Sequence, residues 1–158
     1  MTTTFETIKK KLDEEKIPYT ILEHAQVSTS EEAAMVRGYG KAGMKIGAKA
    51  MIIRSEGKFY QFVLPGDRKL DFKKIKTVLG TESASLATPR EVEEVIGCKV
   101  GAVPPCGTLL GITTYVDSHL LDNEEIAFNA GKHTASITMK TADWMKIIEP
   151  VVADFSQK

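Results

Sequence analysis

Two apolar runs on either side of a polar turn constrain the fold of this 158-residue chain more than any other feature. The runs are Ala50–Ile53 and Phe59–Leu64, and the turn between them is Ser55–Lys58. Short apolar runs bounded by turn residues are typical of buried strands, and a short connection joins antiparallel neighbours. The pattern therefore predicts a β-hairpin, which Pro65–Asp67 ends.

Helical patterns lie on both sides of this hairpin. Residues 4–16 carry Phe5, Ile8 and Leu12 at helical spacing, with charged side chains between them. Thr88–Glu91 form a capping box with a proline at the first helical position, which is a strong helix start. Another helix is predicted to begin at Ser28, and Asp71 and Thr141 are the predicted caps of two more.

Further strands are predicted at residues 19–22, 112–116, 125–129 and 133–139. Strands and helices are mixed without the regular strand–helix–strand alternation of a parallel α/β fold. We therefore expect an α+β fold, with a mixed or barrel-like sheet and helices packed outside it. A length of about 150 residues is usual for one domain, so we expect residues 1–158 to form a single domain.

Composition excludes several classes of protein. Apolar residues make up 42% and charged residues 27% of the chain, which is ordinary for a folded domain and unlike a disordered one. No apolar run approaches the roughly 18 residues that cross a bilayer, and the N-terminus lacks the basic and apolar pattern of a signal peptide. Two cysteines are too few for a disulfide scaffold. We expect a cytoplasmic protein with no membrane partner.

The charges cancel in number, with 21 basic and 21 acidic side chains, but they are unevenly distributed. Residues 41–76 contain ten basic and three acidic side chains, a net charge of +7. Residues 1–40 and 77–158 carry −2 and −5. A strongly positive segment indicates an anionic partner, and a lysine-rich face turned to solvent gives the same pattern.

Familiar catalytic and metal-binding motifs are absent from the sequence. The histidines His24, His119 and His133 do not have metal-ligand spacing, and Cys98 and Cys106 do not form a paired zinc motif. Neither a phosphate-binding P-loop nor a serine-nucleophile elbow is present. We predict no metal and no cofactor.

Two sequence features remain as candidate parts of a catalytic or binding site. Lys49 stands directly before an apolar strand, where it is either the solvated end of that strand or a cation held at the lip of a pocket. The segment Gly101–Gly107 contains adjacent prolines between glycines. Such a segment is either a rigid surface loop or a loop whose unpaired amides bind a substrate carbonyl.

The order and spacing of several short motifs carry a family resemblance. These motifs are Glu23-His24, Val27-x-Thr29-x-Glu31-Glu32-Ala33, Lys49 at the start of a strand, Phe62–Asp67, Leu86–Pro89, Gly97–Pro105 and Phe128–Gly131. The sequence resembles the YbaK/prolyl-tRNA-synthetase-associated editing domains, which are free-standing aminoacyl-tRNA deacylases. The resemblance runs from about Phe5 to Ile148, and its most specific part is the glycine-x-x-x-proline loop from Gly101 to Pro105.

The resemblance implies a single α+β domain whose mixed, partly barrel-like sheet is surrounded by helices. It also implies hydrolysis of the ester that joins a wrong amino acid to the terminal adenosine of tRNA. Lys49 matches the active-site lysine of the family, which contacts the phosphate of the terminal nucleotide. Gly101, Ala102 and Pro105 belong to the loop whose amides bind the aminoacyl carbonyl, so they join Lys49 as catalytic residues. The implied substrate-binding residues are His24, Thr29, Val103, Pro104, Asn129, Gly131 and Ser136.

The implied partners are the aminoacylated 3′ end of tRNA and an aminoacyl-tRNA synthetase. The implied substrate is a tRNA for proline that carries alanine or cysteine. An aminoacyl ester is already activated, so its hydrolysis requires neither a metal nor a protein nucleophile. We therefore interpret Cys106 as a packing residue of the loop and not as a nucleophile. Two alternatives remain open: a tRNA- or nucleotide-binding module without hydrolytic activity, and a hydrolase of small esters.

Overall fold

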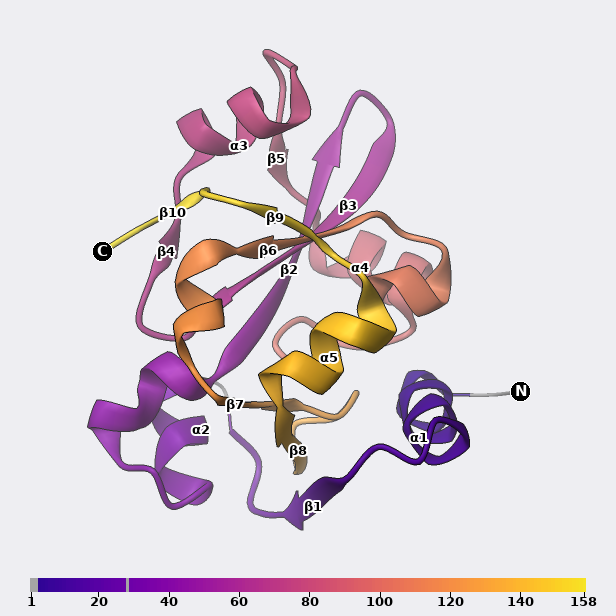
Figure 1. Cartoon of the computed structure of the whole chain (residues 1–158). Helices are drawn as coiled ribbons and strands as arrows, with labels where there is room; N and C mark the ends of the chain where they lie inside the picture. The colour runs from indigo at the N-terminus through magenta and orange to yellow at the C-terminus, as the bar shows by residue number, and fades with distance from the viewer. Residues whose placement is uncertain (1–2, 28) are drawn as a thin grey trace.

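The computed structural model describes residues 3–27 and 29–158, with the backbone alone at residues 41 and 42 (Figure 1). Its five α-helices are α1 (Thr4–Glu14), α2 (Ser30–Val36), α3 (Phe72–Leu79), α4 (Pro89–Ile96) and α5 (Thr141–Ile148). Three short 3-10 helices are η1 (Lys41–Ile46), η2 (Gly107–Leu110) and η3 (Ser118–Asp122). In this part of the chain, no helix is long and apolar enough to cross a membrane.

The larger sheet has five strands in the order β5-β2-β3-β6-β9. Their bounds are β5 (Ser85–Leu86), β2 (Ala48–Ser55), β3 (Lys58–Pro65), β6 (Thr114–Asp117) and β9 (Val151–Ala153). The predicted hairpin is confirmed, because β2 and β3 pair antiparallel along their whole length. Glu56 and Gly57 close it with φ angles of 51° and 77°, the positive values that a tight hairpin turn requires.

A second sheet has three strands in the order β1-β8-β7, and both of its pairings are antiparallel. Its strands are β1 (Tyr19–Glu23), β8 (Ala135–Lys140) and β7 (Glu125–Asn129). A third pairing joins β4 (Lys69–Leu70) to β10 (Ser156–Gln157). A single bridge between Gly47 and Ala127 connects the start of β2 to β7, so the two larger sheets meet there.

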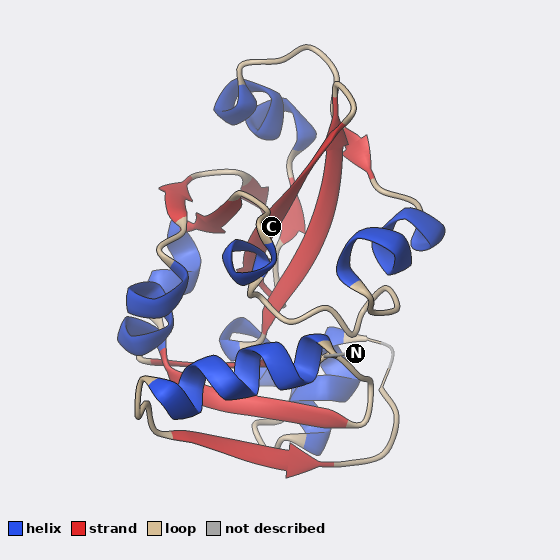
Figure 2. Cartoon of the chain, turned by 90° about the vertical axis from the view of Figure 1, so that its right-hand side faces the viewer, coloured by secondary structure: helices blue, strands red, loops and turns tan. Residues whose placement is uncertain are grey.

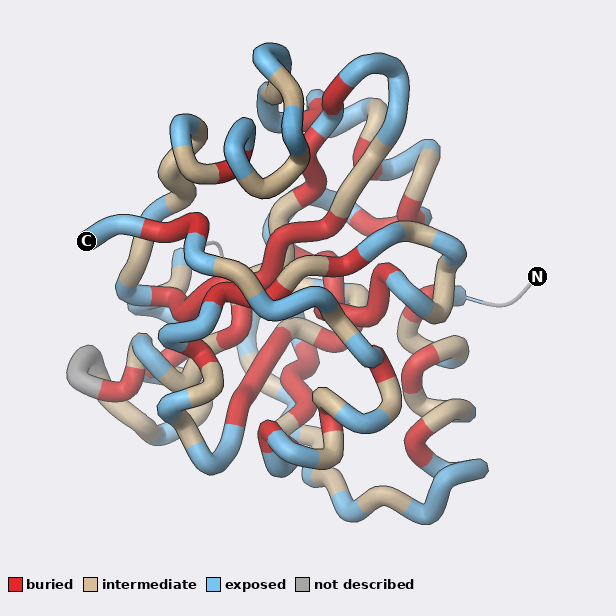
Figure 3. The backbone as a smooth tube through the Cα atoms, turned by 45° about the horizontal axis from the view of Figure 1, so that its top comes forward, coloured by how far each residue is buried: buried red, intermediate tan, exposed pale blue. Residues whose placement is uncertain are grey.

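The main core lies between the two larger sheets and the helices α1 and α5. Ile8 and Leu12 of α1 pack with strand residues such as Phe128 and Ile137. Figure 2 shows α1 lying along the three-stranded sheet. Trp144 of α5 is fully buried in the same cluster. The red segments of Figure 3 run through the centre of the molecule, whereas the turns and helix surfaces are exposed. This is the mixed sheet with helices outside it that the sequence predicts.

Several boundaries differ from the predictions. Thr141 is the first helical residue of α5 rather than its cap, because its hydroxyl donates to the carbonyl of Asn123 at 2.7 Å. The predicted strand 112–116 is found at 114–117, and the strand predicted from residue 133 begins at Ala135. Thr29 caps α2, while the predicted start at Ser28 lies outside the described residues.

Candidate active site

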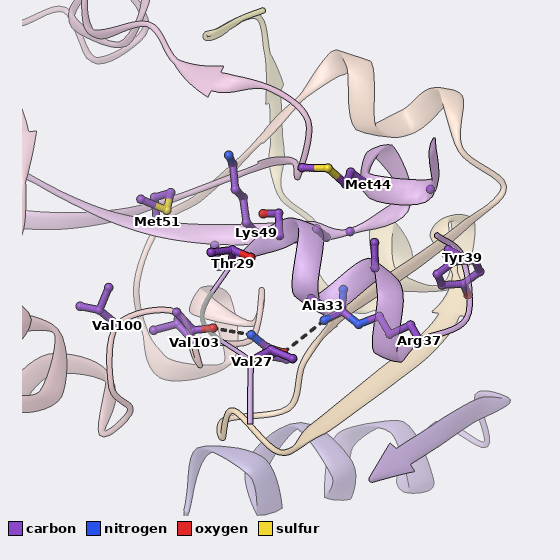
Figure 4. A pocket seen from close by; sticks show the side chains of 18 residues that line it. Val27, Thr29, Ala33, Arg37, Tyr39, Met44, Lys49, Met51, Val100 and Val103 are labelled. Atoms are coloured by element: carbon purple, nitrogen blue, oxygen red, sulfur yellow. Dashed lines mark hydrogen bonds between the residues drawn. The ribbon is translucent and has the colours of Figure 1, made fainter. Parts of the chain in front are cut away.

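A cavity of about 250 Å³ opens between α2, η1, the first half of β2 and the loop that follows α4. Figure 4 shows Lys49 and Met51 on one strand of its wall, with Arg37 apart from them beyond α2. None of the described residues that line the cavity is acidic, whereas Arg37 and Lys49 are both cations. A cavity of this composition is suited to anions and to neutral hydrogen-bond acceptors.

Lys49 is the second residue of β2, opposite Leu64 of β3. Its pairing with β3 fixes its backbone, and its side chain is half-buried. Burial lowers the pKa of Lys49 below the ordinary value of 10.5, while Asp67 opposes this change and Lys69 reinforces it. The ammonium group is therefore held by a rigid element and is partly stripped of water.

The loop between α4 and η2 is held in place by the turn that joins β7 to β8. Three consecutive carbonyl groups of the loop each accept a hydrogen bond from that turn. The carbonyl oxygen of Val100 lies 3.0 Å from Nε2 of His133, and that of Ala102 accepts from the amide of Gly131 at 3.0 Å. The carbonyl between them, that of Gly101, accepts from Nδ2 of Asn129.

These contacts determine where the amides of the loop point. The described peptide bonds are all trans, so each N–H is directed opposite to the carbonyl of its own peptide unit. The N–H groups of Gly101 and Val103 therefore face away from the β7–β8 turn. They have no acceptor among the described residues, whereas the N–H of Ala102 donates to the carbonyl of Lys99 at 3.0 Å. Gly101 and Val103 both line the cavity.

The two prolines fix the far side of the loop. Trp144 donates from Nε1 to the carbonyl of Pro105 at 2.8 Å, and Gln61 donates from Nε2 to the carbonyl of Pro104 at 3.1 Å. Oε1 of the same glutamine accepts from the amide of Gly107 at 2.8 Å. All of these residues are buried and none of them lines the cavity. The bonds to the two prolines therefore hold the loop in place on the side away from the cavity.

Arg37, which is not among the predicted site residues, connects the remaining polar groups of the site. It follows the last residue of α2, and its Nε donates to Oγ of Ser136 at 2.8 Å. One of its terminal nitrogens, Nη2, donates to Oδ1 of Asn129 at 3.2 Å, a bond drawn as a dashed line in Figure 4. Ser136 Oγ also lies 2.8 Å from Nε2 of His24. An isolated arginine before a glycine is common at a helix end, so its sequence context carries no signal for this role.

The partners of His24 define its tautomer. Nδ1 lies 2.8 Å from the carbonyl of Ala25, which can only accept, so Nδ1 carries the proton. Nε2 lies 2.8 Å from Oγ of Ser136, which in turn accepts from Arg37. Two branches of hydrogen bonds thus start at Arg37, one through Ser136 to His24 and one through Asn129 to the loop at Gly101.

The guanidinium of Arg37 is largely buried without a carboxylate partner in the described part of the chain. Burial lowers the pKa of Arg37 to about 10, and the neighbouring Tyr39 acts in the opposite direction. The side chain is still a cation at neutral pH. Its positive charge is met by two neutral acceptors, Ser136 Oγ and Asn129 Oδ1.

The predicted site residues fall into three groups. Those that line the cavity are Lys49, Thr29, Gly101, Val103 and Asn129. His24 and Ser136 are outside the lining and are connected to it by hydrogen bonds through Arg37. Those that support the loop from outside the cavity are Ala102, Pro104, Pro105 and Gly131. The roles assigned to all of them stay predictions.

Cys106 lies next to the loop but is fully buried. Burial raises the pKa of its thiol to about 12, so the reactive thiolate is disfavoured. A separate group of possible metal ligands, Asp117, His119 and Asp154, lies outside the cavity lining. The carboxylate of Asp117 already accepts from the amide of Phe155 and the hydroxyl of Ser156. It is therefore engaged in holding the C-terminal segment.

Comparison with known proteins decides the family. The model of the family described as "Aminoacyl-tRNA editing domain" matches residues 24–147, a span that contains the whole cavity lining. The chain belongs to this family. The predicted resemblance and the enzyme class expected with it, an aminoacyl-tRNA hydrolase, are confirmed.

Individual relatives support the same conclusion for this editing domain. It is 32% identical over 149 residues to the multifunctional Ser/Thr-tRNA deacylase ProXp-y of Escherichia coli K12, covering 91% of this chain and 87% of the relative. It is 28% identical over 145 residues to the prolyl-tRNA editing protein ProX of Acetoanaerobium sticklandii, covering 88% and 87%. The crystal structure of hypothetical protein APE2540 matches with a TM-score of 0.85 at 27% identity, covering 96% of this chain and all of the other. The predicted α+β fold class is confirmed.

Proposed function

We propose that this editing domain acts in trans on aminoacyl-tRNA and hydrolyses the ester of a small, wrongly attached amino acid. One observation carries the proposal: the cavity brings Lys49 together with the free N–H groups of Gly101 and Val103. A cation for the phosphate of the terminal nucleotide and two donors for the ester carbonyl are the groups that this reaction needs.

The chemistry follows from these groups. Water attacks the ester carbonyl, whose oxygen acquires negative charge in the tetrahedral transition state. The amides of Gly101 and Val103 donate to that oxygen, and such a donor is typically worth about 3 kcal/mol of transition-state stabilisation. Because three carbonyls of the loop are tied to the β7–β8 turn, the donors keep their direction while the charge develops. The leaving group is the 2′- or 3′-hydroxyl of the terminal adenosine.

The walls near Arg37 favour a small acyl group. Ala33 and Ala34 of α2 belong to the lining, as does Gly47, where an added Cβ atom would stand 3.4 Å from Nη1 of Arg37. Two assignments fit a small side chain: alanine or cysteine on a tRNA for proline, and the serine or threonine named for the Escherichia coli relative. An aminoacyl-tRNA synthetase as a further partner also stays a proposal.

A deacylation panel tests this function. Wild-type protein is assayed on tRNA charged with alanine, cysteine, serine or threonine, next to Lys49→Ala and Lys58→Ala. Lys58 stands on the same hairpin but at its far end, so it is a matched control. We expect Lys49→Ala to lose at least about a hundredfold in kcat/KM and Lys58→Ala to stay close to wild type. Equal rates for wild type and Lys49→Ala would reject the proposal, and binding without hydrolysis of any of the four would indicate a binding module.

A further inference from the structure

Arg37 has more hydrogen-bond donors than the protein uses. A guanidinium carries five N–H groups. The one on Nε donates to Ser136 and one on Nη2 donates to Asn129, while the other three have no acceptor among the described residues. Among the described residues, no buried side-chain nitrogen lacks a partner, so these N–H groups are accessible from the cavity that Arg37 lines, where a ligand can supply an acceptor.

The space next to these donors is shaped for a small group. A Cβ atom added at Gly47 would stand 3.4 Å from Nη1 of Arg37 and 3.3 Å from the carbonyl of Met44. A side chain at position 47 would therefore press on the carbonyl of Met44 and occupy the space beside the guanidinium. Ala33 and Ala34, both nearly buried, complete this wall of the cavity with single methyl groups.

The charge of the cavity determines which part of an aminoacyl ester enters this space. Arg37 and Lys49 are cations, and no described lining residue is acidic, so the α-ammonium group of the substrate is repelled from the cavity wall. The phosphate of the terminal nucleotide is assigned to Lys49 in the proposed function. The part of the substrate left for Arg37 is the side chain of the acyl group.

We propose that Arg37 is a specificity-determining residue that selects hydroxyl-bearing acyl groups, seryl and threonyl, over alanyl and cysteinyl. This inference rests on the proposed function and names its substrate class. The hydroxyl oxygen of serine or threonine accepts from a free N–H of Arg37, and a thiol is a much weaker acceptor. An alanyl group leaves the same N–H unpaired, and sites built to bond a substrate hydroxyl discriminate strongly against analogues that lack it.

The network behind Arg37 supports this role because it leaves the guanidinium no freedom to turn away. Ser136 holds Nε and Asn129 holds Nη2, from strands β8 and β7 respectively. Two bonds to a planar group fix its orientation, so the free N–H groups keep one direction. Selection by a preorganised donor needs this rigidity.

The test compares acyl groups rather than total activity. Values of kcat/KM for seryl-, threonyl-, alanyl- and cysteinyl-tRNA are measured with wild type, Arg37→Met and Arg37→Lys. Arg90→Met is the matched control, because Arg90 lies on the surface of α4 and pairs with Glu94. Arg37→Lys keeps the charge and removes the planar fork. Thermal unfolding followed by circular dichroism verifies that each variant is folded.

We expect wild type to prefer seryl over alanyl esters and both Arg37 variants to lower the seryl-to-alanyl ratio by at least about tenfold. The ratio for Arg90→Met stays that of wild type. Equal losses on all four substrates would overturn the inference, since they indicate a phosphate contact or a purely structural role. That result leaves the proposed function intact, because the function is tested by Lys49→Ala.

A binding experiment tests the inference even if the protein hydrolyses none of the four esters. The probes are adenosine derivatives with seryl or alanyl joined to the 3′ position by an amide in place of the ester, titrated by calorimetry. Wild type is expected to bind the seryl amide more tightly, and Arg37→Met to bind both alike. Equal affinity of wild type for the two amides contradicts the selection by Arg37.

Discussion

The side-chain amide of Asn129 donates to the carbonyl oxygen of Gly101 and thereby joins two segments that are 28 residues apart in the sequence. The other end of the same amide, Oδ1, accepts from Arg37 at 3.2 Å. Since an amide has a donor end and an acceptor end, the two partners fix its orientation. The network around Arg37 and the loop that contains Gly101 are therefore coupled through one side chain.

Replacing Asn129 with aspartate tests this coupling. The carboxylate still accepts from Arg37, but its second oxygen faces the carbonyl of Gly101, which can only accept. We expect the loop to shift and deacylation to fall by about tenfold to a hundredfold. Asn123→Asp is the control, because Asn123 donates to the carbonyl of Lys45 at 2.8 Å outside the cavity. Steady-state kinetics on both variants measure the difference, and similar rates for the two would argue against the coupling.

Gly101 occupies a backbone conformation that disfavours any other residue. Its φ is +87°, and a Cβ atom there would lie 3.2 Å from Nε2 of His133. Gly101→Ala is expected to cost about 1–2 kcal/mol of stability and to abolish most of the activity. Gly111 has a similar φ of +78° with nothing within 4 Å of an added Cβ, so Gly111→Ala should lose stability alone. Denaturant titrations and deacylation rates separate the two effects, and full activity of Gly101→Ala would contradict the assigned role of the loop.

The lowered pKa of Lys49 predicts an unusual pH dependence of its chemical modification. Burial disfavours the ammonium, so Lys49 loses its proton at a lower pH than the ordinary lysine value of 10.5. The neutral amine is the form that reacts with acylating reagents, so its modification should rise with pH and level off below the pH expected for an ordinary lysine. Mass spectrometry of peptides after short labelling at pH 7 to 11 measures this. A midpoint at or above 10.5 would contradict the effect of burial.

The positive segment 41–76 does not act as one uniform surface. It extends over η1, the β2–β3 hairpin and α3, which Figure 1 shows from the lower left to the top of the molecule. Part of its charge is used internally, because Arg54 pairs with Glu91 and Lys74 with Asp154, at 3.0 Å and 3.1 Å. If tRNA is the anionic partner that this segment indicates, we expect its phosphates to contact the lysines near Lys49.

Lys69 is such a residue, since its charge acts on Lys49. Lys69→Gln is expected to weaken tRNA binding and to reduce the slope of log affinity against log salt by about one. Lys58→Gln is the control, because Lys58 faces a position six residues further along β2, about 20 Å away at about 3.3 Å per residue. Fluorescence titrations at rising salt measure both slopes. Binding that does not depend on salt would show that phosphates are not the contacts.

The local features of the fold were predictable from the sequence. The hairpin was predicted from its apolar runs and turn, and α4 from its capping box at Thr88, whose two reciprocal bonds to Glu91 are present. Such features depend on residues a few positions apart, so the information lies within a short window. The strands β9 and β10 were missed because they are short and are stabilised by distant partners.

The candidate site divides in the same way. Lys49 and the loop from Gly101 to Pro105 were identified from the sequence by their resemblance to a family. Only the tertiary structure brought Arg37 to Asn129 and Ser136, because those contacts span 92 and 99 residues. Likewise, only the packing of the β7–β8 turn against the loop decided which N–H groups of the loop have no acceptor among the described residues. The donors that bind the loop carbonyls come from a distant part of the sequence, and they fix the direction of each peptide unit.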